Sequence, residues 1–487
     1  MAAFSGPCGR HASREKAVQN TDKIWTIVDA KQADYIELSD RVFEMPELNY
    51  REVKSAAAHA EQLRREGFRV ETGIAGLPTA VMGEAGEDGP VIAILGEYDA
   101  LPELSQTPGL SEHQPLPNQP AGHGCGHNLL GAGAMLAAAA VKDFLAERGL
   151  KGRVRYYGCP AEEGGAGKAF MVKEGAFKDV DIAISWHPAD FAAVTAAISL
   201  ANTTIDFEFT GRASHAAAAP HLGRSALDAA ELMNVGVNYM REHMPSDARI
   251  HYAYLDAGGI APNVVQAKAR LRYVVRATMV SQVHELLARV RKIADGAALM
   301  TETTVTSEVV SAMSSLLANT PLEDAMQRNF DRLGPPPFDA EDVAFARRMQ
   351  KTVTPAHIES AFRRSGLPAT DFPLCNAIAP KEAPGPRMMG STDVGDVSWA
   401  VPTVQARGAT YTIGTPGHSW QLTAHGQSPL AHKGMIHVAK IMAGVAADVL
   451  VEPGLLEQAK ADFAERLTRT PYKPLLPDDA KPPFHMF

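Results

Sequence analysis

The amino-acid sequence predicts an α/β protein with two parts: a catalytic domain on a doubly wound, mainly parallel sheet, and an inserted ferredoxin-like domain. The first prediction rests on continuously apolar runs such as residues 91–95, which are typical of strands buried on both faces and which alternate here with helical segments. The second rests on residues 199–310, which follow the order strand, helix, strand, strand, helix, strand of a ferredoxin-like fold.

A length of 487 residues also favours more than one domain, because single hydrophobic cores stop growing at about 250–300 residues. We predict a discontinuous catalytic, metal-binding domain at residues 23–196 and 314–455. Segment 197–313 is expected to serve as a lid or dimerisation domain. Residues 1–22 and 456–487 are expected to be terminal extensions, the first of them a disordered leader.

The elements of the catalytic domain follow from hydrophobic spacing and from helix-ending residues. Val53, Ala56, Ala60 and Leu63 recur at helical spacing, and Gly67 ends that helix. The predicted helices cover 31–46, 52–66, 129–147, 166–176 and 429–450, and the strands 78–83, 91–95, 153–157 and 180–185. Residues 334–390 are proline-rich and predict a loop-and-helix excursion, and the tail from Pro453 is expected to be irregular.

The inserted segment should contain strands at 199–209, 249–255, 264–276 and 301–310, with helices at 222–243 and 281–298.

Composition and charge exclude several classes of function. A formal net charge of −9 is mild for this length and argues against a general binder of nucleic acid or of anionic membranes. No uninterrupted apolar run reaches membrane-spanning length. The four cysteines are spread too widely for a disulfide framework. We therefore expect a cytoplasmic protein in a reducing compartment, with no nucleic-acid or membrane partner.

The stretch Gly-His-Gly-Cys-Gly-His-Asn at 122–128 is the strongest local signal of chemistry. Its glycines allow a sharp turn and a close approach to a ligand, and a helix follows at once. The positive end of that helix should favour a deprotonated Cys125 as a metal ligand. Taken alone, the stretch would fit an ordinary glycine-rich connection equally well.

Further candidate ligands follow other predicted strands and turns. Cys125, His127, Glu163, His187 and His418 lie in separate segments whose strands would end at one edge of the sheet. A thiolate, imidazoles and a carboxylate suit zinc, and manganese where oxygen donors dominate. Since five ligands exceed one tetrahedral site, we infer two divalent ions, Mn²⁺ or Zn²⁺. A single histidine taken without this context would more often be a hydrogen-bonded residue.

The adjacent pair Glu162–Glu163 suggests a division of labour. Neighbouring side chains point in different directions, so one carboxylate can bind metal while the other remains free as a general base. A divalent metal lowers the pKa of water that it binds, which makes such a base effective. Adjacent glutamates are more often a solvated acidic turn, but here they stand between a buried strand and a diglycine.

Together these motifs resemble the M20 metallopeptidase family. The stretches that carry the resemblance are GEYDALP at 96–102, GHGCGHN at 122–128, PAEEGG at 160–165 and WHP at 186–188. Four more point to its amidohydrolase branch, and within it to hydrolases of p-aminobenzoyl-glutamate: GRASHAA at 211–217, PHLGRSALDA at 220–229, STDVGDVSW at 391–399 and TPGHSWQL at 415–422. The similarity spans about residues 30–455.

The resemblance implies a role for each matching residue. It makes Glu162 the general base, and it assigns the metals to Cys125, His127, Glu163, His187 and His418. It implies that His215 reaches the active site from the lid of a neighbouring subunit and stabilises the oxyanion. It also implies that Asn263 and Arg276 bind carboxylate or carbonyl groups of the substrate. Other peptidases of the clan have His-x-Asp where this chain has Glu97-Tyr98-Asp99. We therefore expect Asp99 to support a ligand and do not assign Glu97 to the metals.

The sequence thus predicts a metal-dependent amidohydrolase that cleaves an N-acyl amino acid, such as an aroyl-glutamate or a related amide. Two alternatives stay open: a dipeptidase with the same metal chemistry, and a catalytically silent metal-binding partner subunit. Retention of both Glu162 and Glu163 argues against the silent subunit. Sequence leaves open whether the protein forms a homodimer or a heterodimer with a related chain.

Overall fold

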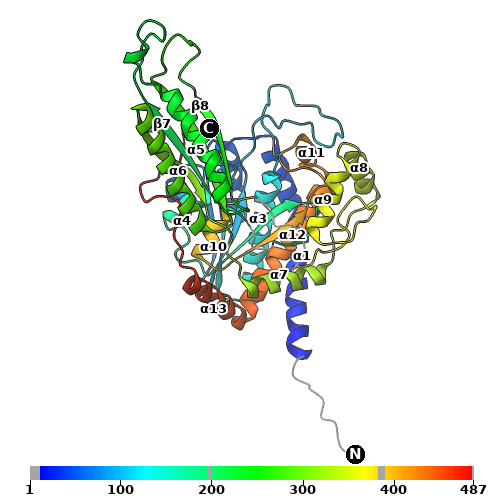
Figure 1. Cartoon of the computed structure of the whole chain (residues 1–487). Coiled ribbons are helices and arrows are strands. Elements are labelled where there is room, and N and C mark those ends of the chain that lie inside the picture. Colours follow the sequence, from blue (N-terminus) through cyan, green and yellow to red (C-terminus); the bar gives the residue numbers. More distant parts are fainter. Residues whose placement is uncertain (1–10, 196–198, 382–389, 485–487) are drawn as a thin grey trace, which may run out of the picture.

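A seven-stranded sheet organises the larger part of the computed structural model, which describes residues 11–195, 199–381 and 390–484 (Figure 1). Its strands lie in the order β1-β2-β4-β3-β5-β11-β6. Their bounds are Arg69–Thr72 for β1, Val81–Glu87 for β2, Val91–Glu97 for β3, Gly152–Cys159 for β4, Ile182–Ala189 for β5, Ala193–Val194 for β6 and Thr403–Ala409 for β11.

The four central strands β4, β3, β5 and β11 are parallel to one another. β1, β2 and β6 add antiparallel pairs at the two margins. The predicted mainly parallel sheet is therefore present. β1, β6 and β11 were not predicted; β1 is a four-residue strand with mostly exposed side chains, which carries little hydrophobic signal.

Helices cover both faces of this sheet, as the continuously apolar strands require. In β3, Ile92 and Ile94 pack in one hydrophobic cluster with α1 (His11–Phe43), α3 (His127–Arg148) and α12 (Pro429–Val451). Val91, Ala93 and Leu95 pack on the opposite face with α4 (Gly167–Lys173) and α10 (Val394–Ala400). Successive side chains of a strand point to opposite faces, so a strand between two helix layers is apolar throughout.

Two of these helices, α3 and α12, are long and apolar enough to cross a membrane by length and composition. They are core helices here: 83% and 78% of their apolar windows are buried within the protein, and the two helices pack against each other. Their hydrophobic character is accounted for by this packing.

A second sheet projects from the first body, at the upper left of Figure 1. Its antiparallel strands lie in the order β10-β7-β9-β8, with bounds Ala201–Thr210 for β7, Arg249–Asp256 for β8, Lys268–Ala277 for β9 and Thr304–Met313 for β10. α5 (Ala226–Met240) and α6 (Val280–Thr301) pack against it. The chain order is therefore strand, helix, strand, strand, helix, strand, within the segment predicted as an insertion.

The amino-terminal prediction was wrong in one respect. Residues 11–22, expected to belong to a disordered leader, form the first part of α1, while residues 1–10 lie outside the described part. No glycine or proline interrupts the chain from His11 to Met45, and the later part of the helix packs Ile24, Val28 and Tyr35 into the core. A helix anchored in this way can extend beyond its buried section.

The carboxyl-terminal prediction also needs correction. The segment expected to be an irregular extension contains α13 (Pro453–Arg469), which packs against α7 (Thr320–Leu333) and α12. Leu455 and Ala459 are buried in the core, and Leu475 is buried beyond the helix. Pro453 stands at the first position of α13, where proline is well tolerated because the N–H that it lacks would have no partner within the helix.

The remaining elements support the catalytic body. α2 spans Val53–Arg65, close to its prediction, and the excursion at 334–390 contains α8 (Ala340–Gln350) and α9 (Pro355–Ser365). A short helix, α11 (Trp420–Thr423), follows the turn that carries His418. Residues 382–389 of the excursion lie outside the described part.

Asn319 provides a test of how firmly α13 belongs to the fold. Its side chain caps α7 by accepting from the Leu322 N–H, and it donates to the Ala459 carbonyl of α13 at 2.8 Å. Asn319→Ala should lower the free energy of unfolding by about 1–2 kcal/mol, the usual cost of a lost helix cap. The measurement is the urea midpoint. Glu457→Ala, on the exposed face of α13, is the control and should change stability by less than about 0.5 kcal/mol. Equal midpoints for both variants would contradict the proposed anchoring.

Candidate metal centre

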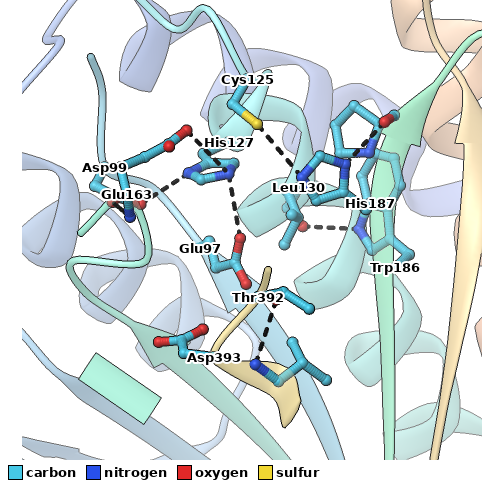
Figure 2. Close-up of polar contacts among 12 residues, drawn as sticks. Glu97, Asp99, Cys125, His127, Leu130, Glu163, Trp186, His187, Thr392 and Asp393 are labelled. Carbon is cyan, nitrogen blue, oxygen red and sulfur yellow. Dashed lines mark hydrogen bonds and ion pairs between the residues drawn. The ribbon is translucent and has the colours of Figure 1, made fainter. Parts of the chain in front are cut away.

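The carboxyl edge of the central sheet gathers the predicted metal ligands, of which Figure 2 labels Cys125, His127, Glu163 and His187. β3 ends at Glu97, β4 leads into the turn with Glu162 and Glu163, and β5 carries His187 close to its end. β11 precedes the turn that carries His418. Strands β3 and β5 are adjacent although the chain runs from β3 to β4 first, and open α/β sheets usually place their ligand sites at such a switch in strand order.

The glycine-rich turn places Cys125 and His127 at the start of α3. Gly126, the residue before the helix, has a left-handed φ of 77°. A Cβ on Gly122 would lie 2.1 Å from the Leu104 carbonyl oxygen, so only glycine allows the two segments to approach this closely. These two positions explain why glycine alternates with candidate ligands in this stretch.

His127 is held in a defined orientation by Asp99. Its Nδ1 lies 2.8 Å from an Asp99 carboxylate oxygen, and both side chains are buried. The other Asp99 oxygen accepts from the Glu163 N–H at 2.9 Å. Asp99 therefore orients the ring of one candidate ligand and the backbone of another, which is the supporting role expected of it. The Nε2 of His127 has no hydrogen-bond partner among the described residues.

Two groups of donor atoms could each hold a divalent ion. One consists of Cys125, His127 and His187, and the other of Cys125, Glu163 and His418, with the donor atoms of each group within 4.8 Å of one another. The Cys125 Sγ lies 3.3 Å from His187 Nε2, and His418 Nε2 lies 3.4 Å from a Glu163 oxygen. All five predicted donors thus meet at one place, and Cys125 belongs to both groups.

Unpartnered buried atoms support metal binding at this place. His127 Nε2 and Glu163 Oε1 are buried and have no hydrogen-bond partner among the described residues. A buried polar atom without a partner costs free energy, so such atoms are expected only where a ligand or ion completes them. The thiol and the imidazoles of this donor set favour zinc, and its carboxylate is also compatible with manganese.

The surroundings shift the pKa values of the two imidazoles, His187 and His127, in opposite directions. Burial, together with Arg407, lowers the pKa of His187 to about 3, so its ring is in the neutral form that binds metals. Burial alone would lower the pKa of His127, but Cys125 and Asp99 raise it well above its ordinary value. A metal at Nε2 must therefore displace a firmly held proton.

The prediction that the helix terminus favours a Cys125 thiolate is not supported by the surroundings. Burial and the nearby Glu163 carboxylate raise the pKa of the Cys125 thiol. The helix terminus is outweighed because the thiol loses water and meets a like charge in its ionised form. A bound cation reverses that balance, since a coordinated thiol is deprotonated.

Glu162 is placed differently from Glu163. Glu162 is 7% exposed, and its carboxylate lies in a group with Glu97 and His127 rather than in either of the two donor groups above. Burial and the neighbouring Glu97 and Glu163 carboxylates raise the pKa of Glu162 well above its ordinary value. A carboxyl group whose pKa is raised in this way is better suited to accept a proton and to return it.

The turn that carries the two glutamates is held by residues that the sequence analysis missed. Ala161, just before the pair, has a left-handed φ of 58°, which is strained for alanine. Its N–H donates to the Glu52 carboxylate at 2.8 Å, and the Tyr50 hydroxyl donates to the Gly165 carbonyl at 2.7 Å. Both ends of the turn are thus fixed from the loop before α2. The only signal in the sequence was a glutamate at the start of a helix, which is common.

Lys168 and Asp393 were also missed. Lys168 is fully buried in α4, and its Nζ lies 2.5 Å from a Glu97 oxygen and 2.7 Å from an Asp393 oxygen. The Lys168 N–H also donates to Asp393 at 2.8 Å. A lysine among small residues after a diglycine could have suggested burial. Its partners, however, come from two distant segments.

The three residues predicted in the lid lie in two places. His215 and Asn263 lie together in the exposed loops at the free end of the second sheet. There His215 forms an isolated antiparallel β-bridge with Val264, and the Ala216 N–H donates to the Asn263 carbonyl. Arg276 lies near the other end of that sheet and donates to the Ser391 hydroxyl at 3.0 Å. Within the described residues of one chain, neither His215 nor Asn263 belongs to a donor group of the metal centre.

A thiol, imidazoles and carboxylates gathered at the carboxyl edge of a mainly parallel sheet define a metal-dependent hydrolase. Residues 93–447 match the model of peptidase family M20/M25/M40, and the chain belongs to that family. It is 42% identical to one of the subunits of p-aminobenzoyl-glutamate hydrolase from Escherichia coli K12, over 94% of this chain and 98% of that protein. It is 30% identical to the Xaa-Arg dipeptidase of Mus musculus, over 88% and 89% of the two chains.

Solved structures share the fold at lower identity. One is a dinuclear metal-binding peptidase of the M20 family from Bacillus subtilis, with a TM-score of 0.56 and 19% identity over 87% of this chain and 99% of that one. Another is the aminobenzoyl-glutamate utilization protein from Klebsiella pneumoniae, with a TM-score of 0.57 and 17% identity over 85% and 96%. These likenesses extend over most of the chain.

Tyr50 tests whether the turn must be held for catalysis. Tyr50→Phe removes one hydroxyl and frees the Gly165 carbonyl, so Glu162 should lose its fixed position. We expect kcat to fall roughly 10- to 100-fold at unchanged metal content, with KM nearly constant, because misplaced catalytic groups slow the chemical step. Steady-state kinetics and elemental analysis provide the measurement. Tyr472→Phe, which also loses a hydroxyl bond, but to Asp396, is the matched control and should keep its kcat. A kcat unchanged in Tyr50→Phe would show that the turn holds itself.

Proposed function

We propose that this protein hydrolyses the amide bond of an N-acyl amino acid, such as p-aminobenzoyl-glutamate or a related aroyl- or acyl-amino acid, with two divalent metals, Mn²⁺ or Zn²⁺. One observation carries the proposal: two donor groups share Cys125 and lie beside the buried carboxylate of Glu162. Similarity to the p-aminobenzoyl-glutamate hydrolase chain over nearly the whole length supports the choice of substrate class.

Each residue of the site has a task in this reaction. Cys125, His127 and His187 would hold one ion, and Cys125, Glu163 and His418 the other. The bound ions would polarise the scissile carbonyl and make water more acidic. Asp99 keeps the His127 ring in place through Nδ1. Glu162 accepts the proton of the attacking water and delivers it to the departing amine, since its raised pKa lets it hold the proton between the two steps.

The similarity to an Xaa-Arg dipeptidase keeps dipeptide hydrolysis as a second candidate. That reaction would use the same metals and the same base, and would differ in the groups that hold the ends of the substrate. A catalytically silent partner subunit is disfavoured, because Glu162 and all five donors are present and converge.

We further propose that the second domain is a ferredoxin-like lid that pairs with another subunit. Its chain order and its strand order β10-β7-β9-β8 are those of that fold class. His215 and Asn263 would then reach the metal centre of the neighbouring subunit, where His215 stabilises the oxyanion and Asn263 holds substrate. Arg276, near the sheet end that meets the catalytic body, would hold a substrate carboxylate or carbonyl group.

The partner can be a second copy or a related chain. The chain also resembles a different subunit of p-aminobenzoyl-glutamate hydrolase from Escherichia coli K12, to which it is 31% identical over 48% of its length. Similarity to two proteins that are each named as one subunit of the same hydrolase supports a heterodimer alongside a homodimer. We propose a cytoplasmic location, which suits the buried free thiols of Cys125, Cys159 and Cys375.

The substrate class and the base can be tested in one set of assays. The metal-loaded protein should hydrolyse p-aminobenzoyl-glutamate or another N-acyl amino acid faster than free dipeptides in a panel of both. Glu162→Gln should retain both metals and lose roughly 10³-fold in kcat, because the proton acceptor is gone. Cys125→Ala is the comparison, and it should lose metal and activity together. Faster hydrolysis of dipeptides would favour the second candidate function. Near-normal turnover by Glu162→Gln would show that Glu162 is not the general base.

The shared active site is tested by mixing two inactive chains. A mixed dimer of Glu162→Gln and His215→Ala chains should regain one working site, which joins an intact Glu162 on one chain to an intact His215 on the other. The expected activity is about half that of the wild-type dimer, measured on mixed dimers purified through two different tags. If such dimers stay inactive, His215 acts within its own chain or takes no part in catalysis.

A further inference from the structure

Glu97, Lys168 and Asp393 form a buried cluster directly below the metal centre (Figure 2 shows Glu97 and Asp393). Glu97 is 2% exposed, and the other two side chains are fully buried. Glu97 uses one oxygen, Oε1, to contact Lys168 at 2.5 Å. Lys168 reaches Asp393 with its Nζ at 2.7 Å and with its backbone N–H at 2.8 Å. The position of the Glu97 carboxylate is therefore fixed from the side away from the metals.

The charges of this cluster do not balance. Within the cluster two carboxylates face one ammonium group, so the remaining negative charge has to be balanced from outside, where the His127 ring lies with its Nε2 3.3 Å from a Glu97 oxygen. Glu162 lies within 4.8 Å of the Glu97 carboxylate and adds to the negative charge. A buried charge without a partner is destabilising. A protonated His127 ring can balance the cluster while no metal is bound, but once Nε2 binds a metal the cluster needs the charge of that metal on the side that faces His127.

The second Glu97 oxygen, Oε2, points to that side. It is buried and has no hydrogen-bond partner among the described residues, and it lies 3.3 Å from His127 Nε2, which also lacks one. His127 Nδ1 is already bound to Asp99, so Nε2 is its metal-facing nitrogen. Two ligand atoms about 2.1 Å from one tetrahedral metal lie roughly 3.4 Å apart. The separation of the two atoms therefore matches that of two ligands of one ion.

We propose that Glu97 is an additional oxygen donor to the metal centre, next to His127, and that Lys168 and Asp393 are positioning residues that aim it. This inference rests on the proposed metal-dependent function. It revises the expectation from the sequence, which left Glu97 out of the centre. A further carboxylate makes the donor set harder, so the ion beside His127 should shift in preference from zinc towards manganese.

Metal binding by Glu97→Gln tests the inference without an activity assay. The substitution keeps the shape of the side chain and leaves Lys168 and Asp393 as a balanced pair. Metal-stripped, full-length protein is titrated with Mn²⁺ and with Co²⁺. Binding is monitored by calorimetry and, for Co²⁺, by its visible absorption. We expect wild type to bind two ions. In Glu97→Gln, one of them should bind at least 10-fold more weakly, with a changed Co²⁺ spectrum, because one donor is lost.

Folding is checked on the same samples. Metal-free Glu97→Gln should melt no lower than metal-free wild type, because a buried excess charge is gone, and the gain in melting temperature on adding Mn²⁺ should be smaller. If Glu97→Gln does not fold, Glu97→Asp replaces it, since it keeps the charge and withdraws the oxygen by one methylene. Asp448→Asn, a buried carboxylate in α12 bonded to Asn329, is the control and should bind both ions normally.

The outcomes separate this inference from the proposed function. If Glu97→Gln binds two ions with wild-type affinity and an unchanged Co²⁺ spectrum, the proposed role of Glu97 is overturned while the proposed two-metal function stands. A wild-type protein that binds fewer than two ions would overturn the two-metal centre itself. Weakening in Glu97→Gln together with normal binding by Asp448→Asn supports Glu97 as a donor.

Discussion

The carboxyl edge of the central sheet concentrates negative charge where water is almost excluded, and the surrounding structure holds that charge in place. Glu97, Asp99, Glu162 and Asp393 are all buried there. Burial penalises each of them as a carboxylate, and their mutual repulsion adds to the penalty. Lys168 and His127 neutralise part of it. Bound cations would balance the remainder, so metals in this site would stabilise the carboxyl edge of the sheet as well as serve catalysis.

The same edge shows how a few backbone contacts set the geometry of the chemistry. Asp99 binds the ring of His127 and the backbone of Glu163 at once, so two candidate ligands move together. Glu52 and Tyr50 hold the ends of the glutamate turn from a different segment. Because each contact is buried, it keeps its position without competition from water. The orientation of Glu162 is thus determined largely by residues that never meet a substrate.

The meeting of the five candidate metal donors could be predicted because each stands in a short motif at the end of a buried strand or in a glycine-rich turn. The supporting cluster could not. The burial of Lys168 depends on Glu97 and Asp393, which come from β3 and from the turn before α10. No spacing in the sequence encodes that meeting. Helix α12 was similarly predicted within a few residues of its bounds, while the existence of α13 depended on packing against α7 and α12.

The position of the second sheet in the chain has a consequence for how the protein assembles. Cys125, His127, Glu163 and His187 precede β7, while His418 follows β10, so the whole second sheet is synthesised between them. β7 to β10 pair with one another and can form while the catalytic body is still open. Bringing His418 to the earlier donors closes a very long loop, which is entropically costly and therefore late. If the proposed metal centre requires all five donors, it is completed only once the two halves of the catalytic body have met, and metal uptake would then mark chains that have completed their folding.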